Sequence, residues 1–368
     1  MRATKRPRQE AQEAQEAQEA QAEPSLPEKV ESILTAADVA QFATAGWVRV
    51  PQAFARDAAL EMQGVMWSQL ERSCGLRQGQ RSSWAAEEEA TAPSQSNGLK
   101  DLKHHPAFRT VGSPRLCGAL DQLLGQGAWA PPKSWGSFLA TFPGRVLGSC
   151  HAQPAAWRIP RAGAGTGWHW DGDPGPDAVA AGLLSPDERP TPHRWPAVQV
   201  MTFHSDVAPG GGGTVLLEGS HVLVERFFRE QAGARNGSLK QNPLKSKFAA
   251  AHPWIQRLST GPEHRLGSTD ACCYCMTEHG GHHRTCHIGQ PGCSCPHPVP
   301  EWVCAAEEAH TIECMETGTV IDGVSLRVVE CSGKAGDAIL WHSGMYHSSS
   351  VNCAQVPRFM RNCCIRAQ

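Results

Sequence analysis

Two residues with metal-ligand chemistry lie two positions apart in the stretch Gly167-Trp168-His169-Trp170-Asp171. On a β-strand, side chains alternate between faces, so His169 and Asp171 point one way while Trp170 points the other. One imidazole and one carboxylate are two of the three protein ligands that a catalytic ferrous iron takes. We therefore expect an iron site here if a distant segment supplies a second imidazole.

The C-terminal part of the chain offers two candidates for that third ligand. Residues 336–352 begin with a Gly-Asp turn, continue as an apolar strand and contain His342 and His347. A ligand from another strand lining the same pocket should lie far away in sequence, and both residues do. Their positions alone leave the choice open.

The order of motifs resembles the phytanoyl-CoA dioxygenase family of iron(II)- and 2-oxoglutarate-dependent oxygenases. The matching elements are, in order, His169, Asp171, Gly212-Gly213-Thr214, Gly219-Ser220-His221, Gly336-Asp337, His347, Ser349, Asn352 and Arg358. The resemblance implies His347 as the third iron ligand, because Ser349 and Arg358 then lie at the family's offsets from its distal histidine.

The resemblance also implies a site for 2-oxoglutarate at Arg358 and Ser349. A carboxylate in a pocket shielded from water needs a permanently charged, bidentate partner, which a guanidinium provides. Arg361 is the alternative if the register differs. Because Asp171 is retained, the family pattern implies C–H hydroxylation, with succinate and CO2 as coproducts, rather than halogenation.

Residues that would contact the substrate are marked less clearly. Trp170, Arg158 and His204 are candidates, although packing or a surface position also explains each of them. The expected partners are oxygen and a small-molecule or lipid-like substrate. One alternative is a non-catalytic or 2-oxoglutarate-independent cupin-like metal-binding protein. A nucleic-acid regulator acting through the basic tail or a cysteine-rich segment is another.

The elements that must position these residues are short strands. Beyond Trp135, apolar runs separated by Gly and Pro predict strands at 137–142, 166–171, 198–204, 214–217, 326–330, 338–342 and 359–365. We expect a mainly β fold with flanking helices, namely a double-stranded β-helix (jelly-roll, cupin-like) barrel. Gly210–Gly213 is interpreted as a tight turn, because the Lys and the helix start of a phosphate loop are missing.

Helices precede the predicted barrel. Thr35 is expected to cap a short helix that runs through Phe42, and a strand follows at 46–50. Helices are predicted at about 57–70 and 114–124, with a polar loop at 75–100 between them. A further helix is expected at 222–232.

Length and composition predict one enlarged catalytic domain, residues 31–368, behind a disordered low-complexity tail, residues 1–30. The formal net charge of −2 and the pI near 6.8 give no sign of a nucleic-acid or membrane partner. No apolar run is long enough for a membrane span or a secretory signal. We expect a cytoplasmic protein, with Lys5-Arg6-Pro7-Arg8 as an alternative nuclear-import signal.

The cysteines are unevenly distributed. Eight of the fifteen lie between Cys272 and Cys314, within a long insertion expected at about 233–325. Residues 272–297 also hold several histidines, so the segment could bind a structural zinc ion or be a thiol-rich surface insert. The odd total argues against complete disulfide pairing.

Overall fold

The computed structural model describes residues 32–84, 98–143, 168–171, 197–232, 241–260, 308–350 and 352–367. The chain divides after Ile33, and the unit that begins at Leu34 holds the elements below. The N-terminal tail with its basic patch and the Cys/His-rich segment 272–297 lie outside the described residues.

Helices and one strand form the first part of this unit. As predicted, Thr35 caps the first helix, because its Oγ1 accepts a hydrogen bond from the Asp38 amide at 3.1 Å. The elements are α2 (Ala36–Ala45), β1 (Trp47–Val50), α3 (Arg56–Cys74), α5 (Pro114–Leu124) and the 3₁₀ helices η1 (Arg81–Ser83), η3 (Lys100–His104) and η4 (Pro106–Val111).

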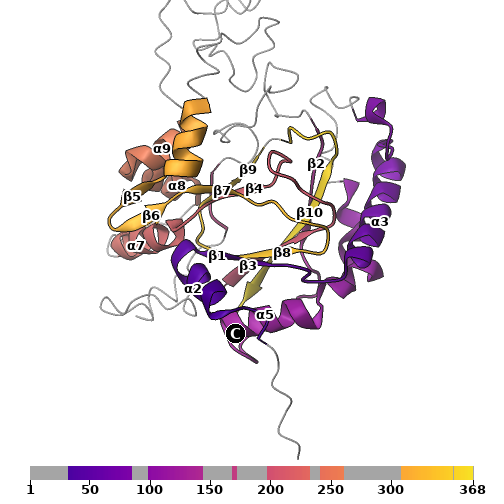
Figure 1. Cartoon of the computed structure of the whole chain (residues 1–368), viewed down its shortest axis with the longest axis horizontal. Helices are drawn as coiled ribbons and strands as arrows, with labels where there is room; N and C mark the ends of the chain where they lie inside the picture. Colours follow the sequence, from indigo (N-terminus) through magenta and orange to yellow (C-terminus); the bar gives the residue numbers. More distant parts are fainter. Residues whose placement is uncertain are drawn as a thin grey trace, which may run out of the picture. The chain divides into compact units, whose positions relative to one another are not determined.

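Five antiparallel strands form the larger sheet, in the order β1-β8-β3-β10-β2 (Figure 1). The strands after β1 are β2 (Ser137–Thr141), β3 (Ala197–Phe203), β8 (Ala338–His342) and β10 (Arg358–Arg366). Every residue of β3 and β8 is buried, because side chains pack on both faces of these two inner strands.

A smaller antiparallel sheet of order β7-β4-β9 lies opposite the larger one. It comprises β4 (Thr214–Leu217), β7 (Val328–Glu330) and β9 (His347–Ser349). Leu216 of β4 packs in one buried cluster with Met201, Ile339 and Met360 of the larger sheet. The two sheets therefore enclose a common interior, and the fold is the predicted double-stranded β-helix.

Helices cover the outer face of the smaller sheet. Val215 and Leu217 point away from the interior and pack with Phe227 of α7 and Phe248 of α8. The elements of this side are α7 (Ser220–Ala232), α8 (Gln241–Ala251), α9 (Pro253–Thr260), the π-helical turn η5 (Glu313–Thr317) and the hairpin β5 (Thr319–Ile321)–β6 (Val324–Leu326). The described parts of the expected insertion thus contribute to a shared core.

Two strand predictions differ from the structure. The described part of the predicted 166–171 strand, residues 168–171, forms only an isolated bridge at His169. The expected 326–330 strand is broken at Arg327, because β6 ends at Leu326 and pairs with β5 while β7 pairs with β4. Among the described helices, none has both the length and the apolar character to cross a bilayer.

Candidate metal and cosubstrate site

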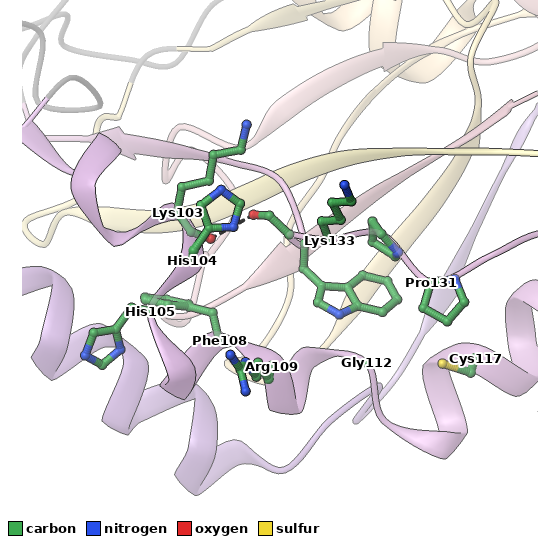
Figure 2. Close-up of a pocket in the computed structure, with 12 residues that line it drawn as sticks. Lys103, His104, His105, Phe108, Arg109, Gly112, Cys117, Pro131 and Lys133 are labelled. Carbon is green, nitrogen blue, oxygen red and sulfur yellow. Dashed lines mark hydrogen bonds between the residues drawn. The ribbon is translucent and has the colours of Figure 1, made fainter.

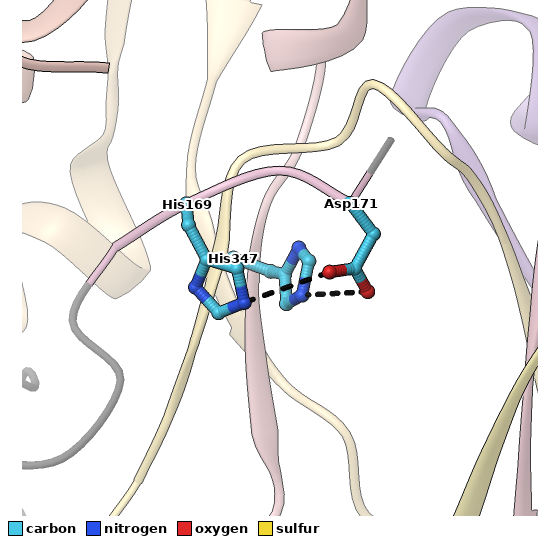
Figure 3. A group of neighbouring side chains, drawn as sticks. All are labelled: His169, Asp171 and His347. Carbon is cyan, nitrogen blue, oxygen red and sulfur yellow. Dashed lines mark ion pairs between the residues drawn. The ribbon is translucent and has the colours of Figure 1, made fainter. Parts of the chain in front are cut away.

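The three predicted metal ligands converge on one point (Figure 3). Nε2 of His169 lies 3.7 Å from Oδ1 of Asp171, and Nε2 of His347 lies 3.5 Å from Oδ2 of the same carboxylate. One ligand atom from each residue lies within 4.8 Å of the other two. Three donor atoms this close together could bind one metal ion once their side chains move inward.

The backbone explains how segments so distant in sequence meet. His169 and His347 form an antiparallel bridge, with the His169 amide donating to the His347 carbonyl at 2.8 Å and the reverse bond at 2.7 Å. Their imidazole rings consequently lie side by side, with centroids 4.3 Å apart. This bridge extends the edge of the smaller sheet and fixes two ligands relative to each other.

The ring of His347 is oriented by the backbone next to it. Its Nδ1 lies 2.9 Å from the carbonyl oxygen of Met345. Because a carbonyl only accepts hydrogen bonds, Nδ1 carries a proton, and Nε2 is the ring nitrogen that faces Asp171 and can bind a metal. Such a contact from the far ring nitrogen is what metal-ligating histidines use to fix tautomer and orientation. The indole of Trp341 packs against the same ring, 5.7 Å between centroids.

Asp171 is held in its ionised form. Burial acts to raise the pKa of Asp171, but a hydrogen bond and charge from His347, with charge from His169 and Lys245, lower it overall to about 2. The carboxylate is therefore deprotonated and ready to bind a cation at neutral pH.

Asn362 is a site residue that the sequence reasoning missed. Its Nδ2 donates to Oδ2 of Asp171 at 3.4 Å, while its Oδ1 is buried without a partner among the described residues. Residues 358, 360 and 362 share one face of β10, so carrying the strand alternation forward from Arg358 would have found it. Asn362 can steady the Asp171 carboxylate and still accept a hydrogen bond at Oδ1.

Arg358 brings a buried positive charge into the barrel. Only 3% of the residue is exposed, and Nη1 donates to neutral groups, the Leu139 carbonyl at 3.1 Å and the Met360 sulfur at 3.2 Å. Burial lowers the pKa of Arg358 to about 10, although Glu330 and Cys331 act to raise it. Within the described part of the chain its Nε has no hydrogen-bond partner and no carboxylate pairs with it.

These residues fit the groups that the sequence predicts. Two imidazole nitrogens and one carboxylate oxygen are the donor set of a mononuclear iron(II) site. A buried guanidinium with an unused donor suits a ligand carboxylate. Ser349 pairs with Thr214 in the strand register and lies on the same face of β9 as His347. A second donor to a ligand bound next to His347 would have to lie on this face.

Two predicted substrate contacts lie away from the three proposed metal ligands. Trp170 is fully buried and packs against Phe228, Phe248 and Tyr346, because it points away from its two neighbours and into the helices over the smaller sheet. His204 lies outside the barrel, where its ring packs on Phe108 and its Nε2 contacts the Thr202 hydroxyl at 3.2 Å. Arg158, the third candidate, lies outside the described residues.

The two alternative ligands point away from the interior. Arg361 is on the opposite face of β10 from Asn362, and its Cζ lies 4.5 Å from the Phe108 ring and 4.4 Å from the Phe138 ring. His342 is on the opposite face of β8 from Trp341, with its ring 5.1 Å from that of His221. Strand alternation removes both from the metal and cosubstrate positions.

Other residues of the family pattern shape the backbone. Asn352 is fully buried, and its Nδ2 donates to the carbonyls of Thr141 and Val356 at 3.0 and 2.9 Å. Gly212 has a φ of +81°, and a Cβ there would lie 2.8 Å from the Cβ of Asn352. Ser220 accepts the Tyr346 amide at 2.8 Å, next to the His347 ligand. These residues shape the backbone around His347 and are not members of the group formed by His169, Asp171 and His347.

Comparison with known proteins finds distant structural similarity only. No protein-family model matches the chain, and no curated protein matches its sequence. Among solved structures it is similar to the non-heme alpha ketoglutarate dependent carbocyclase SnoK from nogalamycin biosynthesis, at 13% identity and TM-score 0.41, covering 91% of this chain and 84% of that one. It is also similar to EctD from S. alaskensis, at 14% identity and TM-score 0.38, covering 92% of this chain and 79% of that one. A third similar structure is HygX from Streptomyces hygroscopicus with nickel and 2-oxoglutarate bound, at 12% identity and TM-score 0.38, covering 91% of this chain and 88% of that one.

Proposed function

We propose that this protein is an iron(II)- and 2-oxoglutarate-dependent oxygenase that hydroxylates a C–H bond of a small molecule, with succinate and CO2 as coproducts. One observation carries the proposal. Two imidazoles and a carboxylate converge on one point, in a barrel that also holds a buried guanidinium with an unused donor. A metal site alone would need only the first of these features.

The side chains divide the work between metal and cosubstrate. His169, Asp171 and His347 would hold iron on one side, which leaves its other positions for 2-oxoglutarate and oxygen. Bound iron supplies oxygen activation, coupled to decarboxylation of 2-oxoglutarate. Arg358 would bind the distal carboxylate of 2-oxoglutarate, with Ser349 as a second donor. Trp341 would exclude water beside His347.

One polar side chain lies beside the proposed metal ligands. Asn362, next to Asp171, has a buried acceptor oxygen without a partner among the described residues. Burying an acceptor without a hydrogen bond is costly, so a substrate hydroxyl or amine at Oδ1 would be stabilised there. This favours a polar small molecule over a lipid acyl chain.

Two measurements test the proposal. Under anaerobic conditions, Fe(II) plus 2-oxoglutarate should give a weak visible charge-transfer band with the wild-type protein and none with His169→Ala. Succinate formation should rise when the right substrate is present, in a screen of amino acids, nucleosides and lipid acyl esters. Iron binding without any response to 2-oxoglutarate would contradict the proposal and identify a cupin-like metal-binding protein.

A further inference from the structure

A pocket of about 380 Å³ lies outside the barrel (Figure 2). Residues of η3 and η4 form one wall, and residues 131–135, which lead into β2, form the other. Phe108 of η4 lines the pocket and packs on Phe138, an outward-facing residue of β2. The pocket therefore belongs to the outer side of the larger sheet, and the metal ligands belong to the inner side.

The lining of this pocket is strongly basic. Lys103, Arg109 and Lys133 are exposed cations, His104 and His105 lie beside them, and none of the lining residues is acidic. Like charges gathered around one concavity repel each other, and an anion between them relieves that repulsion. The chain as a whole has a net charge of −2, so this concentration of positive charge is local.

A buried arginine joins the two walls to the sheet. Nη2 of Arg361 donates to the Gly136 carbonyl at 2.7 Å, to the Ser134 hydroxyl at 3.2 Å and to the Lys103 carbonyl at 3.4 Å. Its Nε and Nη1 are buried and have no partner among the described residues. Arg361 thus fixes the spacing of the walls and adds positive charge behind them.

The pocket also has an apolar side of fixed shape. Trp135 is buried, and its indole lies so close to Gly112 that a Cβ there would come within 2.7 Å of Cζ2. Pro131 and Pro132 restrict the backbone of the same wall. A preformed pocket of this size, with an apolar side and cations among its lining residues, suits a small organic anion.

We propose that this pocket binds a phosphate-bearing small molecule. A phosphate dianion can be shared by several cations, whereas a single carboxylate would leave most of the positive charge uncompensated. The volume exceeds what one phosphate group needs, so an organic part packs against Trp135 and the prolines. These cations line a single pocket, which favours a small molecule over a nucleic acid.

Calorimetric titration of the full chain tests this proposal directly. The probes are AMP and glucose 6-phosphate, the neutral parents adenosine and glucose, and inorganic phosphate. At least one phosphorylated probe should bind, more weakly as salt rises, while its parent should not. Inorganic phosphate should bind at least about tenfold more weakly than that probe, because it lacks the organic part. No binding of either phosphorylated probe, or equal affinity for inorganic phosphate, would overturn the proposal.

Matched variants locate the bound probe. Lys103→Gln/Lys133→Gln should weaken binding about tenfold or more, since charge-assisted hydrogen bonds are lost. Arg72→Gln/Lys247→Gln removes two positive charges from other helices and should leave the affinity unchanged. Gly112→Ala should also weaken binding while keeping every cation, because Trp135 must move. An equal loss in the Arg72/Lys247 control would overturn the assignment.

One more variant separates this pocket from the barrel. Arg358→Gln removes the buried interior cation and should leave binding of the phosphorylated probe intact. If binding were lost in this variant, the anion would be in the barrel and the outer pocket would not be its site. This binding does not depend on iron, so a failure of the anion-pocket proposal would leave the proposed oxygenase activity untouched, and the reverse also holds.

Discussion

Arg358 and Arg361 lie three residues apart on the same strand, both are buried, and burial lowers the pKa of each to about 10. They face opposite sides of the sheet. Arg361 is packed between two phenylalanine rings and bonded to backbone carbonyls, which is a structural role. Arg358 donates to a carbonyl and a sulfur and keeps an unused Nε inside the barrel. If the proposed function holds, strand face, more than residue type or burial, separates a binding residue from a packing residue.

The sharpest version of this comparison involves neighbouring residues at the metal site. His169→Ala or Asp171→Ala should lower succinate formation more than about 1000-fold, because an iron ligand is lost. Trp170→Phe, between them, should retain iron and activity and lower only the free energy of unfolding. Iron content by mass spectrometry and a coupled succinate assay check both results. Equal loss of iron in all three variants would mean that the strand faces are misassigned.

Changing the two arginines should give opposite results. Arg358→Gln is expected to raise the KM for 2-oxoglutarate roughly 100-fold, since a charge-assisted bidentate contact to a carboxylate is lost. Arg361→Gln should leave that KM near the wild-type value and destabilise the fold by ~2–3 kcal/mol, because buried carbonyls lose their donor. Steady-state kinetics and chemical denaturation distinguish the two. A large KM effect from Arg361→Gln would reverse the assignment.

The outer side of the barrel should also set the acid sensitivity of the fold. Burial lowers the pKa of His204 to about 3 and that of His221 to about 4. The unfolded chain takes up these protons below pH ~6.5 while the folded chain does not. The free energy of unfolding therefore decreases as the pH is lowered. At pH 5 each histidine should cost ~2 kcal/mol. Chemical denaturation at pH 7 and pH 5 measures the decrease in the free energy of unfolding. This decrease should be smaller in His204→Phe than in the wild type and the same as in the wild type for the exposed control His104→Gln.

The smallest expected effect belongs to Asn362 on the inner face. Asn362→Ala should weaken Fe(II) binding about tenfold, because Asp171 loses a neighbour that orients it. Cys363→Ala, the adjacent outward-facing residue, serves as the matched control and should leave the metal affinity unchanged. Competition with a chromophoric chelator measures both. Unchanged metal affinity in Asn362→Ala would show that the 3.4 Å contact does not orient the carboxylate.

Local patterns in the sequence predicted much of the fold. The helix at 114–124 has the predicted bounds, because Ser113 caps it, Pro114 occupies its first position and Gly125 follows its end. The pairing of His169 with Asp171, and the opposite direction of Trp170, follow from alternation alone. The choice of His347 over His342 came from the family resemblance, and the geometry now places only His347 with the other two.

His204 lies near a predicted pocket strand, but proximity along a strand does not say which face is inside. The alternation that pairs His169 with Asp171 already turns Trp170 away from them. Which face is inside depends on which sheet packs against which, and these contacts join residues far apart in the chain. Asn362 was missed for the same reason, although its spacing from Arg358 contains the information. The basic outer pocket joins 103–109 to 131–135, and only the fold reveals that arrangement.

The backbone bridge between His169 and His347 has a consequence for folding. The two residues are separated by most of the barrel sequence, so their pairing pays a large loop-closure entropy and depends on nearly all strands being in register. A metal ion held by both would bind the folded chain and not the unfolded one. It would then act as a cross-link on the whole domain, raising the melting temperature as its concentration rises. Iron starvation would reduce the amount of folded protein in addition to its catalysis.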